Sequence, residues 1–464
     1  MQDLAGSERR RGWLRSLGLD RPELRAWALY DWANSAMVCT IITAVFPTYY
    51  SSVACAGLEP AVASRMLAVA TTIGMVFIAA LSPVLGAFAD YTAQKKRLLG
   101  LFLTLGLAAV AGMFFIRTGD WVLASALFIL ANIGANGSFV FYDALLPHIA
   151  SDEEIDRVST AGYALGYLGG GVLLALNLAW IVRPGLFGLP TDPGSTLGAR
   201  LAFLSVAAWW GLFSIPLFRR VPEPRAVHPA EELHGESPVR ATLERLSNTA
   251  RDLKRYRNGF LMLLAFLIYN DGIGTIMRMA VVYGSEIGIK QEDLIRSILI
   301  VQFVGIPFSF LFGAIASRIG VKVSILWGLA VYTVICVIGY FMTTAGHFLL
   351  LSILVGTVQG GTQALSRSMF ASLIPRDRSG EYFGFFSVAE KFAGILGPAL
   401  FAAINWGTGS SRGAILGVIG FFVVGGILLW MVDVEAGQRE ARLDEPAEAL
   451  ALTPLASAAT SESP

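Results

Sequence analysis

Long apolar stretches separated by short polar loops occupy most of the sequence. A helix that crosses a bilayer needs roughly 20 mainly apolar residues, and by this criterion the chain contains about twelve spans. Only 15% of the residues are charged, whereas a soluble protein carries about 25%, so much of the apolar surface has to face lipid. The predicted spans lie near residues 26–50, 62–89, 98–116, 121–147, 159–181, 201–218, 260–285, 294–316, 323–343, 348–373, 382–403 and 413–432.

A polar turn with clustered cations occurs once in each half of the chain. In the first half, Gly86 and Asp90 close an apolar run and are followed by three cations at 95–97. The segment 313–322 repeats this design, with small residues followed by Arg and Lys. These two copies predict two similar six-helix bundles, related by an axis along the membrane normal.

The distribution of charge predicts the domain organisation and the orientation. We expect an N-terminal tail (1–25), a six-helix bundle (26–218), a hydrophilic connector (219–258), a second six-helix bundle (259–432) and a disordered tail (433–464). About 25 of the 35 Lys and Arg fall in the tails, the connector and the even-numbered loops. Both tails and the connector are therefore expected in the cytoplasm, with the protein in the inner membrane of a bacterium.

Several function classes lack support in the sequence. A net charge of +1 argues against nucleic acid as a partner, and Cys39, Cys55 and Cys336 form neither a disulfide framework nor a metal-ligand spacing. The sequence contains no phosphate-binding loop and no His-Glu-x-x-His pattern, and its four histidines fall in loops or at span ends. We therefore expect no enzyme activity, no cofactor and no metal site.

Three groups of motifs carry a resemblance to a known family. The twelve-span layout and the Gly86-x-x-x-Asp90 turn resemble the major facilitator superfamily, although Ala93 stands where that family commonly has glycine. The stretches 30–35 (YDWANS), 141–147 (FYDALLP), 363–368 (QALSRS) and 380–384 (GEYFG) are similar to its vacuole effluxer branch. The resemblance implies the major facilitator fold and transport. Fungal members of that branch are linked to the release of amino acids from vacuoles.

Polar residues in the first and seventh spans are the first candidates for substrate binding. An ionisable side chain at membrane depth costs a few kcal/mol or more, so each needs a partner or a function. In span one, Asp31 shares a helix face with Ser35, and span seven carries Asp271 at the equivalent place. Either acid binds substrate or a coupling proton, or it forms an internal salt bridge that orients helices. The candidates in these spans are Tyr30, Asp31, Asn34, Tyr269, Asn270, Asp271 and Arg278.

A polar stripe on the tenth span supplies further candidates. Gln359, Gln363 and Arg367 follow one another at four-residue steps, which places them on one helix face. A guanidinium with neighbouring amides suits a carboxylate or phosphate, but Arg367 could instead pair with an acid such as Glu381 or with helix-end carbonyls. In span four, Asn136 either lines the cavity or locks helices together.

Four charged residues other than Asp271 are candidates for coupling or gating. By resemblance, Asp90 should meet the start of span eleven near Gly384 through a charge–dipole contact. Asp143 lies one turn before the end of span four and is expected to anchor a gate. Glu390 and Lys391 are adjacent on a helix and point about 100° apart, so we expect them not to pair with each other.

These patterns favour a secondary active transporter that works by alternating access. The buried acids, cations and amides suit a small polar solute, above all an amino acid or a similar zwitterion, carried by a monomer in the lipid bilayer. Whether a proton or a sodium ion couples transport stays open. Efflux of drug-like or lipid-like amphiphiles is the alternative, because aromatic residues could line an apolar cavity, and a non-transporting sensor is a remote one.

Overall fold

The structure is a computed structural model, and it describes residues 14–192, 194–224, 256–393 and 411–443, together with residues 12, 397, 400, 403 and 404. Regular structure in this part of the chain is helical throughout, and eleven helices are long and apolar enough to cross a membrane. In the first half the elements are α2 (Pro22–Met37), η1 (Val38–Ala44), α3 (Val45–Tyr49), η2 (Tyr50–Ala54), α4 (Pro60–Thr92), α5 (Lys95–Gly112), η3 (Met113–Phe115), α6 (Trp121–Ile149), α7 (Ile155–Val182), η4 (Pro184–Phe187) and α8 (Leu197–Arg220). In the second half they are α10 (Arg257–Glu286), α11 (Gln291–Ile319), α12 (Val321–Tyr340), α13 (Ala345–Ser372), η6 (Arg376–Arg378), α14 (Ser379–Phe392), α16 (Ser411–Gly417), α17 (Ile419–Trp430) and α18 (Val434–Leu443).

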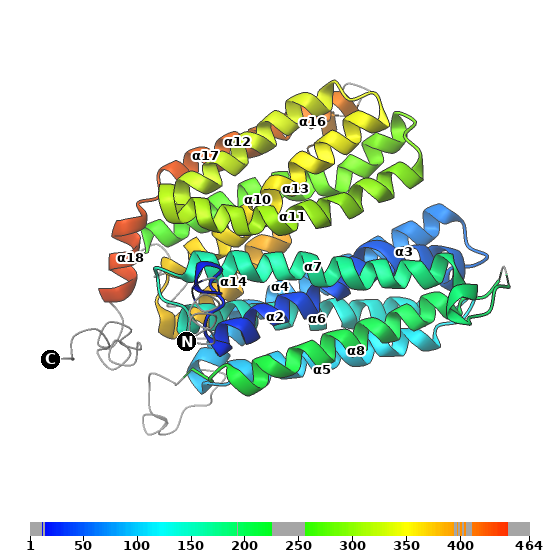
Figure 1. Cartoon of the computed structure of the whole chain (residues 1–464), viewed down its shortest axis with the longest axis horizontal. Coiled ribbons are helices and arrows are strands. Elements are labelled where there is room, and N and C mark those ends of the chain that lie inside the picture. Colours follow the sequence, from blue (N-terminus) through cyan, green and yellow to red (C-terminus); the bar gives the residue numbers. More distant parts are fainter. Residues whose placement is uncertain are drawn as a thin grey trace, which may run out of the picture.

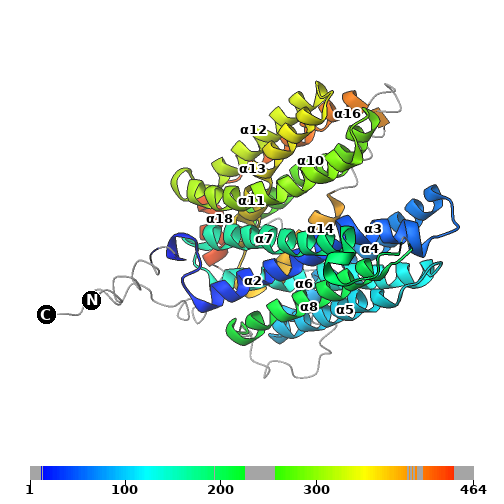
Figure 2. The same ribbon diagram turned by 45° about the vertical axis from the view of Figure 1, so that its right-hand side comes forward.

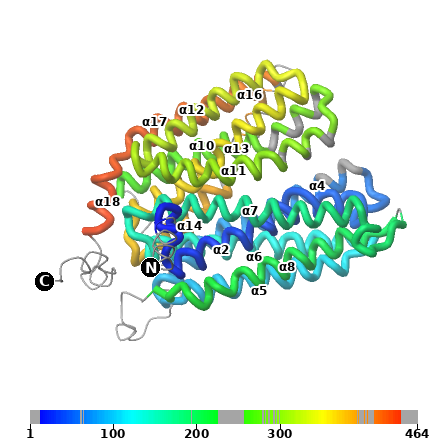
Figure 3. Tube along the Cα trace, viewed as in Figure 1, coloured from blue at the N-terminus to red at the C-terminus, as the bar shows by residue number. Residues whose placement is uncertain are grey.

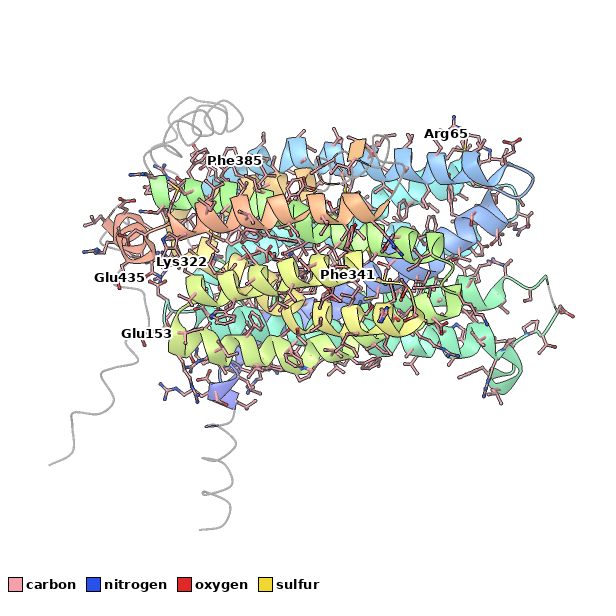
Figure 4. All side chains as sticks on the ribbon, turned by 90° about the horizontal axis from the view of Figure 1, so that it is seen from above. Arg65, Glu153, Lys322, Phe341, Phe385 and Glu435 are labelled. Atoms are coloured by element: carbon pink, nitrogen blue, oxygen red, sulfur yellow. The ribbon has the colours of Figure 1, made fainter. Side chains whose placement is uncertain are left out.

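The helices form two bundles, as the sequence predicts (Figure 3). We call the end where α6 and α13 finish and α14 begins the closed end, because the bundles meet there. The contacting pairs include α4 with α14, α6 with α14, and α7 with both α11 and α13. Towards the other end, the open end, the two sets of ribbons diverge (Figures 1 and 2). Glu153, Lys322 and Glu435 lie at the closed end and Arg65 at the open end (Figure 4).

The two bundles repeat each other in detail at the closed end. The Lys96 ammonium donates to the carbonyls of Phe218 and Val221 at 2.9 and 2.6 Å, which fastens α5 to the end of α8. Lys322 makes the matching contacts at the start of α12, with the carbonyls of Trp430 and Val432 at 3.2 and 2.9 Å. The internal repeat that the sequence predicts therefore also appears in the structure, as matching lysine contacts in the two bundles.

The backbone of the turn between α4 and α5 has a conformation that favours glycine, the residue that the major facilitator superfamily commonly has where this chain has Ala93. Ala93 has a φ of 51° and is the one non-glycine residue with positive φ in the described part of the chain. An L-residue in this left-handed region crowds its own Cβ against the backbone, and glycine does not. The equivalent turn between α11 and α12 has Gly320, with a φ of 88°.

The expectation of a disordered C-terminal tail is wrong for Val434–Leu443, which form α18. The Asp433 carboxylate accepts the Ala436 N–H at 2.9 Å and so caps the first turn. Gly437 packs against Leu373 and Asn258, and Ala441 is buried. The small residues on one face let this polar helix dock, a feature that the Ala/Glu-rich composition hides.

The described residues cover the eleventh predicted span only in part. Its beginning lies in α14, which starts at Ser379 and ends at Phe392, while most of residues 394–403 lie outside the described residues. Most of the connector, 225–255, and the tail beyond residue 443 also lie outside them.

Glycines on α7 bring α2 and α7 into backbone contact. A Cβ added at Gly169 would lie 2.4 Å from the Trp32 carbonyl oxygen and 2.8 Å from its ring. At Gly170 it would lie 2.9 Å from the Ser35 carbonyl oxygen. Because these obstacles include backbone atoms, the neighbouring helix cannot relax by turning a side chain away.

Replacement of Gly169 by alanine should therefore lower the melting temperature of the purified protein, with a loss of about 1–3 kcal/mol from overpacking. Gly426 on α17 is the matched control, because a Cβ there meets its nearest neighbours at an ordinary 3.8 and 3.9 Å. Gly426→Ala should leave the melting temperature unchanged or raise it, since alanine favours helix by about 1 kcal/mol. Equal effects of the two substitutions would contradict the close approach of α2 and α7.

Candidate functional site

A single arginine from the second bundle is held inside the first bundle near the closed end. Arg367 on α13 is 3% exposed, and its Nε–H donates to the Ser159 hydroxyl at 3.0 Å. Its Nη1 donates to Asp31 and Asp143 at 3.3 and 3.1 Å. Its Nη2 donates to Asp31 and to the Ser159 carbonyl at 3.3 and 3.1 Å. All five N–H groups of the guanidinium thus have an acceptor, and each acceptor belongs to the first bundle.

Aromatic rings complete the surroundings of this guanidinium. The Arg367 Cζ atom lies 4.8 Å from the ring centre of Trp27, 5.6 Å from that of Tyr142 and 4.7 Å from that of Tyr163. A cation over an aromatic face gains about 0.5–2 kcal/mol. We call Trp27, Asp31, Tyr142, Asp143 and Tyr163 the cation cage.

The sequence builds the cage by local packing of α2, α6 and α7. The Trp27 and Tyr142 rings stack at 4.4 Å, and the Trp27 Nε1–H donates to the Tyr142 carbonyl at 2.9 Å. The Tyr142 hydroxyl donates to Asp31 at 2.7 Å and so fixes this carboxylate. Gly162 leaves room for the Asp31 carboxylate, because a Cβ at this position would lie 2.5 Å from an Asp31 oxygen.

Arg367 pairs with acids, as one of the alternatives had it, but not with the acid named there. The sequence suggested an acid such as Glu381 or helix-end carbonyls, and the acids that pair with Arg367 are Asp31 and Asp143. The sequence did not identify Asp31 as a partner because Asp31 and Arg367 are 336 residues apart and belong to different bundles. For Asp31, the salt-bridge alternative is the arrangement present. The sequence did not predict the roles of Tyr142, Tyr163, Trp27 and Ser159. The motifs 30–35 and 141–147, which each contain a Tyr-Asp pair, nevertheless supply Asp31, Tyr142 and Asp143 of the cage.

The candidates on α10 and α13 meet within the second bundle. The Gln363 amide donates to the Asn270 side-chain oxygen at 2.5 Å, and the Tyr269 and Ser366 hydroxyls are 2.6 Å apart. Asp271 is 1% exposed and accepts the Gly397 N–H at 3.0 Å. The predicted polar faces of these two helices therefore pack against each other.

The remaining candidates for substrate binding make none of the contacts described above. The Asn136 amide donates to the Asn132 carbonyl at 2.9 Å within α6, and a role in lining the cavity stays a prediction. The Tyr30 hydroxyl, the Asn34 amide and the Gln359 carbonyl oxygen have no hydrogen-bond partner in the described part of the chain. The Arg278 side chain lies outside the described residues.

The expectation that Glu390 and Lys391 do not pair is wrong. The Lys391 ammonium lies 2.8 Å from a Glu390 carboxylate oxygen. Backbone positions on a helix point about 100° apart, but both side chains are long and flexible enough to turn towards each other. Lys391 is 11% exposed in its side chain and Glu390 is 40% exposed, so the acid remains near solvent.

Asp90 makes the predicted contact with the start of the eleventh span. Its carboxylate accepts the N–H groups of Gly380 and Glu381 at 3.1 and 2.8 Å, in the first turn of α14. Lys95 lies 2.5 Å from the same carboxylate. The contact is one turn earlier than Gly384, which instead packs against Pro83. Its role in gating stays a prediction.

Comparison with known proteins identifies the family. Residues 19–442 match the family described as vacuole effluxer Atg22 like. The MFS-type transporter YxiO of Bacillus subtilis (strain 168) is 37% identical over 411 residues, which cover 88% of this chain and 94% of that one. The chain belongs to the Atg22-like family of the major facilitator superfamily. It is therefore an integral membrane transporter.

More distant members and solved structures agree with this assignment. Autophagy-related protein 22 of Yarrowia lipolytica (strain CLIB 122 / E 150) is 28% identical over 318 residues, or 63% of this chain, and the match spans about half (53%) of that protein's length. The proton:xylose symporter XylE superposes with a TM-score of 0.67 at 13% identity, over 92% of this chain and 99% of its own. FucP in the outward conformation gives 0.64 at 13% identity, over 89% and 100%. At such identity the structures support the fold alone.

Two of the closed-end contacts of this Atg22-like protein differ in chemistry. Asp90 is neutralised by Lys95 of its own bundle and meets backbone N–H groups of the other. Arg367, in contrast, inserts a full charge into the opposite bundle. Another ion pair also crosses this end, between Arg442 on α18 and Asp152, which are 2.6 Å apart. Separation of either ion pair would leave unpaired charge on both sides, whereas separation of the Asp90 contact would not.

Replacement of Asp90 by asparagine should shift the protein towards an arrangement opened at the closed end. The change removes one acceptor and the charge, and hydrogen bonds to charged groups contribute about 1.5–3 kcal/mol. Spin labels on cysteines introduced at the exposed positions Glu153 and Arg318 report the distance across this end by electron–electron double resonance. We expect a longer distance population to grow about tenfold or more in the variant.

Asp293→Asn is the control, because Asp293 lies in the first turn of α11, near the open end. Among the ion pairs of the described residues, its one partner is Arg296, at 4.0 Å. The same distance distribution in the Asp90 variant and the unsubstituted protein would show that Asp90 does not hold the closed end.

Proposed function

We propose that the protein is a secondary active transporter that moves a small zwitterion, such as an amino acid, by alternating access. The observation that carries this proposal is the insertion of Arg367 between Asp31 and Asp143 of the opposite bundle. The contact joins the bundles near one end while the ribbons diverge towards the other (Figure 1). Its rupture would open the closed end and allow the opposite end to close.

The closed end is proposed to face the cytoplasm of a bacterial cell. Arg97, Arg219, Arg220 and Arg318 are exposed at this end, and clusters of cations remain on the cytoplasmic side of a membrane. The structure then corresponds to an outward-facing state.

The polar residues at membrane depth favour a substrate that carries both charges. Asp271 supplies a carboxylate on α10, and the Gln363–Asn270 pair supplies amides beside it. Arg367 becomes available to a carboxylate only when it leaves Asp31 and Asp143, because all its donors are used in the present state. A zwitterion can use both kinds of group in one transport cycle.

The substrate class can be tested by a thermal-shift screen followed by counterflow in liposomes. A ligand that binds only the folded protein stabilises it by about 2.7 kcal/mol at a hundred times its dissociation constant. We expect stabilisation by a group of amino acids, and uptake of the same labelled amino acid into liposomes preloaded with it. Stabilisation and exchange of hydrophobic amphiphiles alone would favour drug or lipid efflux instead.

Asp271 is proposed to carry a coupling proton. Asp271→Asn keeps the side-chain size and can still accept the Gly397 N–H, but it cannot release a proton. Uptake driven by a pH gradient should fall to the level of empty liposomes, while counterflow exchange continues. Full gradient-driven uptake by the variant would remove Asp271 from coupling, and loss of counterflow as well would indicate a role in binding.

A further inference from the structure

The cation cage is a complete binding site whose occupant belongs to another part of the molecule. Its five residues lie on α2, α6 and α7 of the first bundle, and Arg367 reaches them from α13 of the second. When the closed end opens, the cage keeps its carboxylates and rings and loses its cation.

Without Arg367, the negative charge of Asp31 and Asp143 in the cage has to be neutralised in another way. Of the groups that face Asp31 and Asp143, the Tyr142 hydroxyl is neutral, and the nearby Glu390 is itself paired with Lys391. Two carboxylates in the interior of a bundle, without a cation, are unfavourable, so separation of the bundles favours either uptake of a proton or entry of another positive group.

We propose that Trp27, Asp31, Tyr142, Asp143 and Tyr163 bind the cationic group of the transported solute, a guanidinium or a primary ammonium, at the place that Arg367 occupies when the closed end is shut. This inference rests on the proposed transport cycle, because only separation of the bundles vacates the site. Arg367 then acts as a tethered competitor of the substrate, and its release leaves a guanidinium on the second bundle for the carboxylate of the same solute.

The geometry of the cage favours a flat or small cation. Asp31, Asp143 and Ser159 present acceptors to all five N–H groups of one guanidinium, while rings of Trp27 and Tyr163 lie within 5 Å of its centre. Gly162 borders the site beside Asp31, and a methyl group added there would lie 2.5 Å from an Asp31 oxygen and 3.1 Å from the Arg367 Nη2 atom. A primary ammonium can use the same carboxylates, whereas a quaternary ammonium has no N–H to donate.

The cage is within reach of the closed end. Asp143 precedes the end of α6 by six residues, and Arg367 precedes the end of α13 by five. At a rise of 1.5 Å per residue, the site lies about 8–9 Å from these helix ends. A solute entering from this side would therefore meet it early in its passage.

The test vacates the cage in the full-length purified protein and supplies a free cation. Arg367→Ala should melt at a lower temperature than the unsubstituted protein, and methylguanidinium chloride should restore part of the loss, with sodium chloride at equal concentration as the salt control. The apparent affinity for methylguanidinium should exceed that of the unsubstituted protein by about tenfold or more, because the tethered competitor is gone. Arg296→Ala removes an exposed arginine, 73% exposed in its side chain, and should show no such response.

Two further variants show whether the cage itself binds the cation. Asp31→Asn combined with Arg367→Ala should abolish the response to methylguanidinium, and so should Gly162→Ala combined with Arg367→Ala. If Arg367→Ala does not fold, Arg367→Gln is measured in the same way. The absence of a response in the foldable Arg367 variant, or an equal response in the Asp31 double variant, overturns the proposal.

A measurement on the intact cage links the site to the transport cycle. Asp90→Asn, with Arg367 unchanged, opens the closed end more often and should bind agmatine or arginine more tightly than the unsubstituted protein does. Equal binding by both proteins would mean that the cage is not offered to solutes. Counterflow of any solute by the unsubstituted protein tests transport separately, so failure of the cation site and failure of the transport proposal remain distinguishable.

Discussion

The buried ion cluster of Arg367, Asp31 and Asp143 is the interaction on which the arrangement of the two bundles depends. Removal of one partner from a buried pair costs about 3–5 kcal/mol, because the other charge stays behind without compensation. Here that cost is distributed over two bundles, which would have to move apart in the proposed transport cycle. The cluster can therefore hold one end shut firmly and still release it, provided that something replaces each charge.

Close approach of the bundles makes this cluster possible, and glycines at equivalent places in the repeat provide it. A Cβ at Gly86 on α4 would lie 2.0 Å from the Gly380 carbonyl oxygen of α14, and one at Gly313 on α11 would lie 2.3 Å from the Thr160 hydroxyl of α7. A glycine in each half thus allows its helix to pack closely against a helix of the opposite half. These two interfaces, α4 with α14 and α11 with α7, hold the bundles together.

The sequence is sufficient to predict the spans and the two halves, because span length, hydrophobicity and internal repetition can be read directly along the chain. The contact of Asp90 with the start of α14 was expected from the resemblance to the major facilitator superfamily, and it lies one turn earlier than expected. It is insufficient for the cage, since Arg367 and Asp31 come together only when two bundles pack, at a sequence separation of 336. Helical wheel reasoning failed for Glu390 and Lys391, because it fixes the direction of Cβ and not of a flexible side chain. Helix α18 was missed because its stabilising partners lie in the bundle rather than in its own composition.

In the proposed transport cycle, the cation cage links the strength of closure to the binding of substrate. If a solute cation takes the place of Arg367, every contact that strengthens closure at this site also raises the concentration of solute needed to displace it. Evolution of a tighter gate at these residues would therefore weaken binding from the same side, unless another contact shares the load. The contact of Asp90 with α14 lies at the same end, is made with backbone N–H groups and takes no part in the cage. In the proposed cycle, separate contacts for gating and for competition let the two properties vary independently.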